Sequence, residues 1–446
     1  MEKEENFNQF KEFIEQNDKY IKTNNIEEIQ KIYPLINNYE EIFLRGYHKR
    51  KSEGAFYTNK EISDFMVAET LICLLNKNID LTDQKIIKLQ SLEDIFRLDL
   101  NFKNNITQLL LNTTICDPAC GSGGFLLSAA DILYKTLIKL NCELSKIQIK
   151  NQILVNLYGF DINKYAITLC LLKLLKWFNS EPKIRMKQII SILKSNLQIQ
   201  NSIITSKFPK FDIIIGNPPY GNILNQEEKE ILEKENIFFK DIYCTFLKKS
   251  LAWSNEFVGF LVPKSFLLRQ GYIKFRNDFF SNANILKIYD IGSKIFKRVT
   301  NEVQILIYEN QKNLPKQDLA VYDYPKTKII TYSDQDVDSL RVCFNINCPL
   351  CLKSKKLYVY TFDHKCPYCN SNTKELNRIR IKPRRKILQI LEKLEKTGDL
   401  NYLNPVDYPR MIRGEEENGL REVKRKLKKD TTGSCFFISA RNDFNY

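Results

Sequence analysis

Phe211-Asp212-Ile213-Ile214-Ile215-Gly216-Asn217-Pro218-Pro219-Tyr220 is the stretch of sequence that decides the fold. The apolar run over 211–216 predicts a buried β-strand. Two successive prolines cannot continue a strand or lie inside a helix, so the chain must turn where this strand ends. In open α/β sheets, ligands bind at this edge. The loop would present an amide, a carbonyl and an aromatic ring to a ligand; the alternative is a proline-rich turn after a core strand.

Short apolar runs alternate with longer helical stretches between residue 114 and about residue 310. Further strands are predicted at 114–116, 157–160, 257–262, 285–289 and 303–308. Strands that alternate with helices indicate a mostly parallel, doubly wound sheet. We therefore expect an α/β fold with a Rossmann-like sheet.

The length and charge of the chain limit the kinds of protein that it can be. A chain of 446 residues exceeds the usual size of one hydrophobic core, so two or more domains are expected. The net charge of +15 predicts an acidic partner, of which nucleic acid is the most common, with a Lys- and Ile-rich genome as the alternative explanation. No apolar run reaches the ~18 residues of a membrane span, and the acidic N-terminus is not a signal peptide. We expect a cytoplasmic protein with no membrane partner.

Two acidic residues follow predicted strands. Asp117 opens the glycine-rich stretch 117–124, in which glycines allow a tight strand-to-helix turn and a close approach of the backbone to a ligand. The glycine spacing is not that of dinucleotide-binding loops, and Asp117 suits an amino-bearing ligand. Asp161 ends the next strand, where such an acid commonly binds the ribose hydroxyls of a nucleoside. The alternatives are a structural turn for the glycine loop and a helix N-cap for Asp161.

Four motifs occur in a fixed order, namely Gly54-Ala55-Phe56-Tyr57-Thr58, the stretch 117–124, Gly159-Phe160-Asp161 and Asn217-Pro218-Pro219-Tyr220. This set resembles the gamma-class N6-adenine DNA methyltransferases, the TaqI-like enzymes and their restriction–modification relatives, which use S-adenosylmethionine. The resemblance spans roughly residues 44–310. Ribosomal RNA and protein-glutamine methyltransferases share the last motif but usually not the first.

The resemblance implies a role for each motif residue. Asn217 and Pro218 would accept hydrogen bonds from the target amine, and Tyr220 would stack on the flipped-out base. Phe296 would be a second aromatic contact of the base, with core packing as the alternative. The cofactor would be held by Phe56, Tyr57, Thr58, Asp117, Ala119, Gly121, Gly123, Asp161, Ile162 and Asn196.

Two Cys-Pro-x-Cys pairs, at 348–351 and 366–369, are separated by fourteen residues. This spacing is typical of a tetrahedral zinc site with four thiolate ligands, and a cytosolic location disfavours disulfides. A closed four-thiolate site holds one structural zinc ion. Whether this zinc ribbon also contacts DNA is left open. The predicted ligands are Cys348, Cys351, Cys366 and Cys369.

The C-terminal region is basic. Residues 371–446 contain 18 Lys and Arg against 11 Asp and Glu, a net charge of +7. The run 424–429 suits phosphate contacts, which position a protein on DNA without reading its sequence, and a solvated helix face is the alternative. Recognition regions of TaqI-like enzymes are usually larger. Two alternatives follow: a truncated gene product, or sequence recognition by a separate specificity or restriction subunit.

The sequence thus predicts five regions: a helical lead-in at 1–50, a methyltransferase catalytic domain at 51–310, a connector at 311–342, a zinc ribbon at 343–372 and a basic, partial target-recognition region at 373–446. The predicted function is site-specific methylation of adenine N6 in double-stranded DNA from S-adenosylmethionine, in a restriction–modification or phage-defence system. The alternatives are an RNA or protein-glutamine methyltransferase, and a DNA-binding remnant without turnover.

Overall fold

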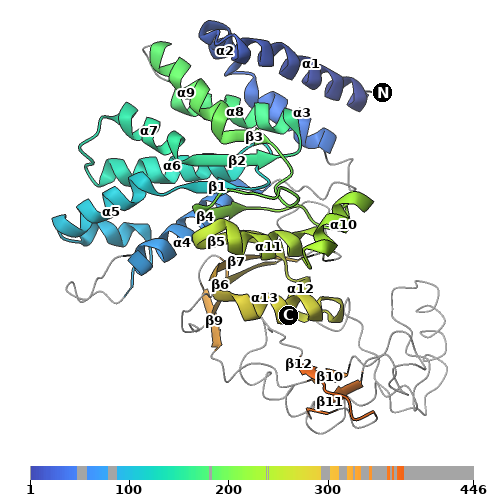
Figure 1. Ribbon diagram of the computed structural model, residues 1–446. Helices are drawn as coiled ribbons and strands as arrows, with labels where there is room; N and C mark the ends of the chain where they lie inside the picture. The colour runs from blue at the N-terminus through green and yellow to red at the C-terminus, as the bar shows by residue number, and fades with distance from the viewer. Residues whose placement is uncertain are drawn as a thin grey trace, which may run out of the picture. The chain divides into compact units, whose positions relative to one another are not determined.

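The protein is described by a computed structural model, in which the chain forms two compact units (Figure 1). The first unit is Met1–Asp338 with Leu376–Arg385, and the second is Ser339–Glu375 with Lys386–Tyr446. The structure describes residues 2–47, 58–78, 88–179, 183–237, 239, 241–292, 302–310, 319–324, 327–332, 341–343, 359–361, 364–365 and 369–375.

The first unit is built on a nine-stranded sheet with the order β3-β2-β1-β4-β5-β7-β6-β8-β9. Strands β1 to β5 run parallel to one another. Strand β7 is antiparallel to both β5 and β6, β8 is parallel to β6, and β9 is antiparallel to β8. The predicted α/β class is confirmed. The strands are β1 (Ile115–Asp117), β2 (Leu157–Asp161), β3 (Leu197–Ile199), β4 (Phe211–Gly216), β5 (Ser254–Pro263), β6 (Ala283–Gly292), β7 (Val303–Asn310), β8 (Leu319–Asp323) and β9 (Thr327–Tyr332).

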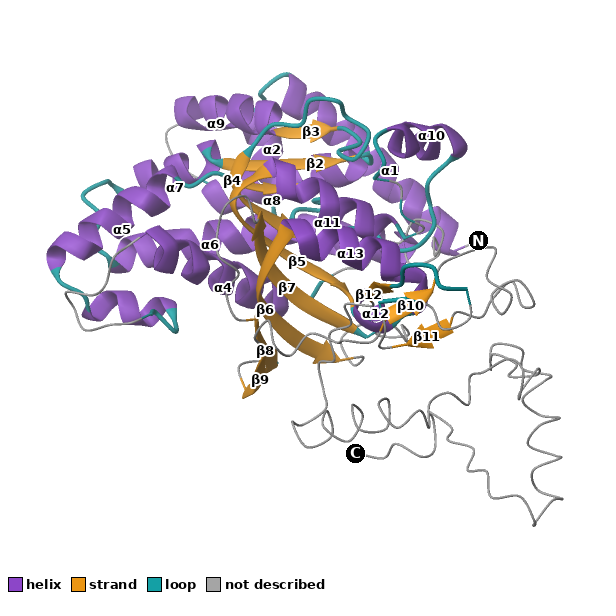
Figure 2. Cartoon of the chain, turned by 60° about the horizontal axis from the view of Figure 1, so that its bottom comes forward, coloured by secondary structure: helices purple, strands orange, loops and turns teal. Residues whose placement is uncertain are grey.

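Helices cover both faces of this sheet, with α4 and α6 on one side and α11 and α13 on the other (Figure 2). Both α4 and α11 contact β5, a central strand. Strands buried on both faces read as continuous apolar runs, as in Ile213, Ile214 and Ile215 of β4, which are at most 1% exposed. The helices are α4 (Lys60–Asn78), α5 (Leu100–Asn112), α6 (Gly124–Lys139), α7 (Lys146–Val155), α8 (Lys164–Phe178), α9 (Lys183–Asn196), α10 (Gln226–Lys234), α11 (Ile242–Trp253), α12 (Ser265–Leu268) and α13 (Ile273–Asn282), with 3-10 turns at Leu92–Arg97 and Gln270–Tyr272.

Three helices precede the sheet: α1 (Glu2–Lys22), α2 (Ile26–Ile32) and α3 (Ile36–Tyr47). Helices α1 and α3 contact α8, and α2 contacts α9. Apolar residues of these helices, such as Phe10 and Ile29, are fully buried and continue the core of the first unit. Among the residues that the structure describes, no helix is both long and apolar enough to cross a membrane.

The second unit contains a three-stranded antiparallel sheet with the order β11-β10-β12. Its strands are β10 (Arg341–Cys343), β11 (Val359–Thr361) and β12 (Lys374–Glu375). Of the four predicted zinc ligands, only half-buried Cys369 is among the described residues; Cys348, Cys351 and Cys366 lie outside them. Within the described ranges, no cluster of three or more His, Cys, Asp or Glu residues could hold a metal ion. The zinc ribbon therefore stays a prediction.

Candidate functional site

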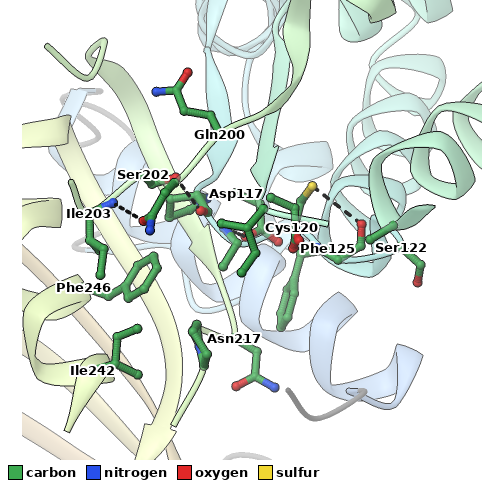
Figure 3. Close-up of a pocket in the computed structure, with 18 of the residues that line it drawn as sticks. Asp117, Cys120, Ser122, Phe125, Gln200, Ser202, Ile203, Asn217, Ile242 and Phe246 are labelled. Atoms are coloured by element: carbon green, nitrogen blue, oxygen red, sulfur yellow. Dashed lines mark hydrogen bonds between the residues drawn. The ribbon is translucent and has the colours of Figure 1, made fainter. Parts of the chain in front are cut away.

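A cavity of about 270 Å³ lies at the carboxyl ends of four neighbouring parallel strands. Asp117 ends β1, Asp161 ends β2, Gln200 follows β3 and Asn217 follows β4, and all four residues line the cavity. Figure 3 shows side chains from these segments directed at the same space. The order of the strands reverses beside β1, and ligands of open α/β sheets bind at this kind of position.

Asp117 is a buried carboxyl group, only 1% exposed. The backbone N–H of Ala119 donates to its Oδ1 atom at 3.1 Å. Burial raises the pKa of Asp117 to about 8, and the negative charge of Asp161 adds to the increase. A buried carboxylate is unfavourable unless a cation or several donors compensate its charge. The cavity is therefore suited to a ligand that brings a positively charged amino group to Asp117.

Asp161 ties the glycine-rich loop to the following helix. Its Oδ2 atom accepts a hydrogen bond from Gly121 N at 2.9 Å, and its Oδ1 atom accepts one from Asn163 N at 2.8 Å. Asn163, and not Asp161, is the N-cap of α8, since its side chain accepts from Tyr165 N and Ala166 N. Asp161 also lines the cavity, and a carboxylate is an acceptor that suits ligand hydroxyls.

The glycine-rich loop depends on backbone conformations that favour glycine. Gly121 has a φ of +52°, and Gly123, the N-cap of α6, has a φ of +80°. A Cβ atom on Gly123 would lie 2.3 Å from Cys170 Sγ, in the packed core. The next residue, Gly124, has no heavy atom within 4 Å of the place where its Cβ would lie.

Substitution of these two neighbouring glycines by alanine should have opposite effects on the stability of the protein. We expect Gly123→Ala to lower the free energy of unfolding by about 2–4 kcal/mol, because left-handed backbone and overpacking both destabilise. The matched variant, Gly124→Ala, should be neutral or stabilise by up to about 1 kcal/mol, since it lies in the first turn of α6. Urea unfolding of both variants measures the difference. Equal stabilities would contradict the geometry of the loop.

The walls of the cavity also include apolar side chains and residues that no motif indicated. Ile162 is 68% exposed at the rim. Phe43 of α3 and the stretch Gln200–Ile203 line the cavity as well. Ser202 Oγ donates to the carbonyl oxygen of Pro118 at 2.7 Å, which joins the segment after β3 to the glycine-rich loop. The sequence analysis predicted no strand at 197–199, so nothing in it indicated residues 200–203.

Helix α3 is bonded to the glycine-rich loop. Glu40 Oε1 accepts a hydrogen bond from Ser122 Oγ at 2.8 Å. The same oxygen lies 2.6 Å from Lys173 Nζ of α8, and the two charged side chains are 13% and 10% exposed. Together with Phe43 in the cavity wall, this ion pair makes the N-terminal helices part of the site.

Asn217 lies at the base of the cavity with both ends of its amide bonded. Its Nδ2 atom donates to Thr58 Oγ1 at 3.2 Å, and its Oδ1 atom accepts from the Tyr220 hydroxyl at 2.5 Å. Thr58 and Pro219 also line the cavity. The preceding Gly216 has a φ of +151°, and a Cβ there would lie 2.5 Å from Asp117 Oδ1, so the ends of β1 and β4 meet closely.

Tyr220 is buried in the loop that follows β4. Its side chain is 5% exposed and is not part of the cavity wall. The hydroxyl donates to Asn217 Oδ1 and lies 3.1 Å from the carbonyl oxygen of Leu261, and the ring packs edge-on against Tyr243 with centroids 6.0 Å apart. The stacking role expected for Tyr220 stays a prediction.

Asn196 is also corrected. It ends α9 immediately before β3, so it lies at the amino edge of the sheet, opposite the cavity. Its buried Nδ2 atom is within 3.3 Å of the carbonyl oxygens of Leu154, Val155 and Leu157. The side chain therefore joins α9 to the start of β2 and does not reach a ligand in the cavity.

The structure brings most of the other predicted site residues together. Gly123 and Pro218 belong to the loops of the site but do not line the cavity. Phe56, Tyr57 and Phe296 lie outside the described residues, so their roles stay predictions. The predicted residues that line the cavity are Thr58, Asp117, Ala119, Gly121, Asp161, Ile162 and Asn217.

Parts of the chain are similar to known proteins. Residues 155–296 match the Eco57I restriction-modification methylase family. The type II restriction enzyme and methyltransferase RM.Eco57I of Escherichia coli is 26% identical over 253 residues, which cover 46% of this chain and 25% of that protein. The type II methyltransferase M.VspI of Vibrio sp. (strain 343) is 23% identical over 301 residues, covering 64% of this chain and 55% of that protein.

The chain thus spans about half or less of the length of these two relatives, which are restriction–modification methyltransferases. Among solved structures, the type I restriction-modification system methyltransferase subunit from Streptococcus thermophilus is 15% identical, with a TM-score of 0.38. That match covers 65% of this chain and 51% of the subunit.

Proposed function

We propose that this chain is the methyltransferase of a restriction–modification system and transfers a methyl group from S-adenosylmethionine to N6 of an adenine flipped out of double-stranded DNA. The observation that carries the proposal is the position of Asn217, whose bonded amide lies in the same cavity as Asp117 and Asp161. The homologues, and the match of residues 155–296 to a family of restriction–modification methylases, support the reaction class. The order of the four sequence motifs supports the gamma class and adenine as the target.

The residues of the cavity fit this cofactor. The Asp117 carboxyl is buried and would pair with the ammonium group of the methionine part. Asp161, which lines the cavity at the end of β2, would bind the ribose hydroxyls, and exposed Ile162 would pack on the adenine ring. When bound, the cofactor supplies an electrophilic methyl group on a sulfonium. Phe56 and Tyr57 would line the methionine end of the cofactor, as the resemblance implies.

The acceptors of the loop would activate the target amine. The N6 lone pair of adenine is delocalised into the ring and is a poor nucleophile. Asn217 Oδ1 and the Pro218 carbonyl oxygen would each accept a hydrogen bond from one N–H group of this amine. Both would stabilise the positive charge that develops on the nitrogen. The new N–C bond would form as the S–C bond breaks and its electron pair stays on sulfur, and one N–H proton would then pass to water. No covalent intermediate with the protein is needed, because orientation allows direct displacement.

Double-stranded DNA is the proposed substrate, and the base must leave the stack because N6 lies within it. The net charge of +15 supports a polyanionic partner. A separate specificity or restriction subunit is the proposed protein partner. One structural zinc ion, bound by Cys348, Cys351, Cys366 and Cys369, completes the proposal.

A methyl-transfer assay tests the function. Purified chain is incubated with S-adenosylmethionine carrying an isotope-labelled methyl group and with duplex DNA, RNA or a protein extract, and the products are digested and separated by mass spectrometry. We expect the label in N6-methyldeoxyadenosine, and sequencing of methylated DNA should then give one sequence context. Label only in RNA or in protein glutamine, or no label in any substrate, would overturn the proposal.

A further inference from the structure

We propose that Glu40 of α3 is a positioning residue for cofactor binding. Its carboxylate holds Ser122, and with it the glycine-rich loop, in the form that binds the methionine part of S-adenosylmethionine. This inference rests on the proposed function and deepens it. Glu40 precedes both the stretch that resembles the gamma class, which begins near residue 44, and residues 155–296, which match the family. The contacts of Glu40, and not the resemblance, therefore carry the inference.

The glycine-rich loop has an adaptable backbone that must be ordered before it can bind a ligand well. Ser122 lies between Gly121, with a φ of +52°, and Gly123, with a φ of +80°. Glycine loses more conformational freedom than any other residue when it is ordered. Gly121, Ser122 and Gly124 line the cavity, so the order of this backbone bears directly on a ligand there. Contacts that fix the loop in the ligand-free protein should raise the affinity, because less freedom is then lost on binding.

Side chains from two other elements hold neighbouring residues of this loop. Asp161, at the end of β2, accepts a hydrogen bond from Gly121 N at 2.9 Å. Glu40, in α3, accepts one from Ser122 Oγ at 2.8 Å. A hydrogen bond to a carboxylate is stronger than one between neutral groups. Asp161 is proposed to contact the ligand itself, whereas Glu40 would act on the ligand through Ser122.

Lys173 of α8 compensates the charge of Glu40. Its Nζ atom lies 2.6 Å from the Oε1 atom that also accepts from Ser122, and the side chains of Lys173 and Glu40 are 10% and 13% exposed. A buried carboxylate without a counterion is strongly unfavourable. The amino-acid part of the cofactor carries its own carboxylate, which an uncompensated charge beside the loop would repel. The ion pair thus lets α3 hold the loop without adding net charge beside the cavity.

Helix α3 contributes a second residue from the same turn. Glu40 and Phe43 are three positions apart, so they lie on one face of the helix. Phe43 is 3% exposed and lines the cavity, and its ring centroid is 5.1 Å from that of Phe10 in α1. The anchor of the loop and an apolar part of the cavity wall therefore come from one helix turn. The N-terminal helices are thus a working part of the cofactor site.

Ser122→Ala tests the inference with a small change. It removes the hydroxyl that bonds Glu40 and leaves the ion pair with Lys173 in place. We expect the Kd for S-adenosylmethionine, measured by calorimetry without DNA, to rise about 5- to 30-fold, as for the loss of one hydrogen bond to a charged group. The kcat at saturating cofactor should stay within about threefold, because bound cofactor orders the loop in both proteins.

Ser250→Ala is the matched control. Ser250 lies in α11, is fully buried, and its Oγ atom is 2.6 Å from the Tyr308 hydroxyl. It belongs neither to the glycine-rich loop nor to the cavity wall. The same substitution therefore removes a buried hydroxyl far along the chain from the loop, and the Kd should not change. An equal rise in Kd would assign the effect to a general loss of stability and would overturn the inference.

Two double variants keep the test decisive if Ser122→Ala folds poorly. Both carry Lys173→Met, so neither has the ion pair. Glu40→Gln in this background keeps an amide oxygen that can accept from Ser122, whereas Glu40→Ala removes the acceptor. We expect the Kd of the alanine double variant to be at least about fivefold higher than that of the glutamine double variant. Urea unfolding of both variants shows that each is folded.

The outcomes separate the inference from the proposed function. A Kd within twofold of the original in Ser122→Ala, or equal Kd values in the two double variants, would overturn the role of Glu40 while the proposed function stands. Failure of the unsubstituted chain to bind S-adenosylmethionine is a distinct result, because no variant is involved, and it would remove the proposed function together with this inference.

Discussion

Asn217→Ala is expected to lower kcat for methyl transfer by at least about 100-fold, an effect comparable to the loss of one preorganised group that stabilises developing charge. The substitution removes the Oδ1 atom at the base of the cavity, and with it the acceptor for one N–H bond of the target amine. The amine then keeps its lone pair delocalised in the ring. Single-turnover rates on duplex DNA, at saturating S-adenosylmethionine, measure the effect on the chemical step.

Two measurements make this expectation specific. The affinity for the cofactor should change little, because Asp117 and Asp161, which are proposed to bind the cofactor, end other strands than the one that Asn217 follows. Asn217→Asp, which keeps acceptor oxygens but loses the donor to Thr58, should retain more activity than Asn217→Ala. Single-turnover transfer by the alanine variant within a few-fold of the unsubstituted rate would rule out the role of the amide.

Asp117 gives the second large effect, on the pH dependence of cofactor binding. Its pKa is raised to about 8 in the ligand-free protein, so below pH 8 the group is mostly protonated. Pairing with an ammonium group requires the ionised form, and binding below pH 8 must therefore release a proton. Cofactor affinity should rise with pH between about 6 and 8, by up to about tenfold per pH unit. Above about pH 8 an α-amino group loses its own charge, and the affinity should level off or fall.

Calorimetric titrations at several pH values test this dependence. Asp117→Asn should bind the cofactor at least about tenfold more weakly at pH 8, and its affinity should vary little between pH 6 and 7. Asp212→Asn is the matched control, since Asp212 lies at the amino end of β4, where it accepts from Thr114 N and Oγ1 at 2.8 Å. The control should show the same rise with pH as the unsubstituted chain. A rise that persists in Asp117→Asn would assign the titration to another group.

The sequence predicted which site residues lie at the ends of strands. Asp117, Asp161 and Asn217 each follow an apolar run, and the carboxyl ends of neighbouring parallel strands meet at one edge, so their convergence could be predicted without coordinates. Asn196 fails the same rule, because it precedes a strand and therefore lies at the other edge.

Two kinds of information were not in the sequence. The direction of the Tyr220 ring depends on hydrogen bonds to Leu261 and on packing against Tyr243, contacts that span 41 and 23 positions of the chain. Phe43 enters the cavity because α3 packs on α8, which no local pattern indicates. The sequence predicted a helical lead-in at 1–50, but not that one of its residues would line the cavity.

The ion pair between Glu40 and Lys173, with its bond to Ser122, limits how the chain can be recombined with its relatives. A hybrid protein joined near residue 50 would take Glu40 and Phe43 from one parent and the glycine-rich loop from the other. Unless both parents carried compatible residues at these positions, the charge of Glu40 or of Lys173 would lose its counterion beside the cavity. Exchange of the first helices would then alter ligand binding as well as folding. Hybrid proteins that keep their function are better joined at another position in the chain.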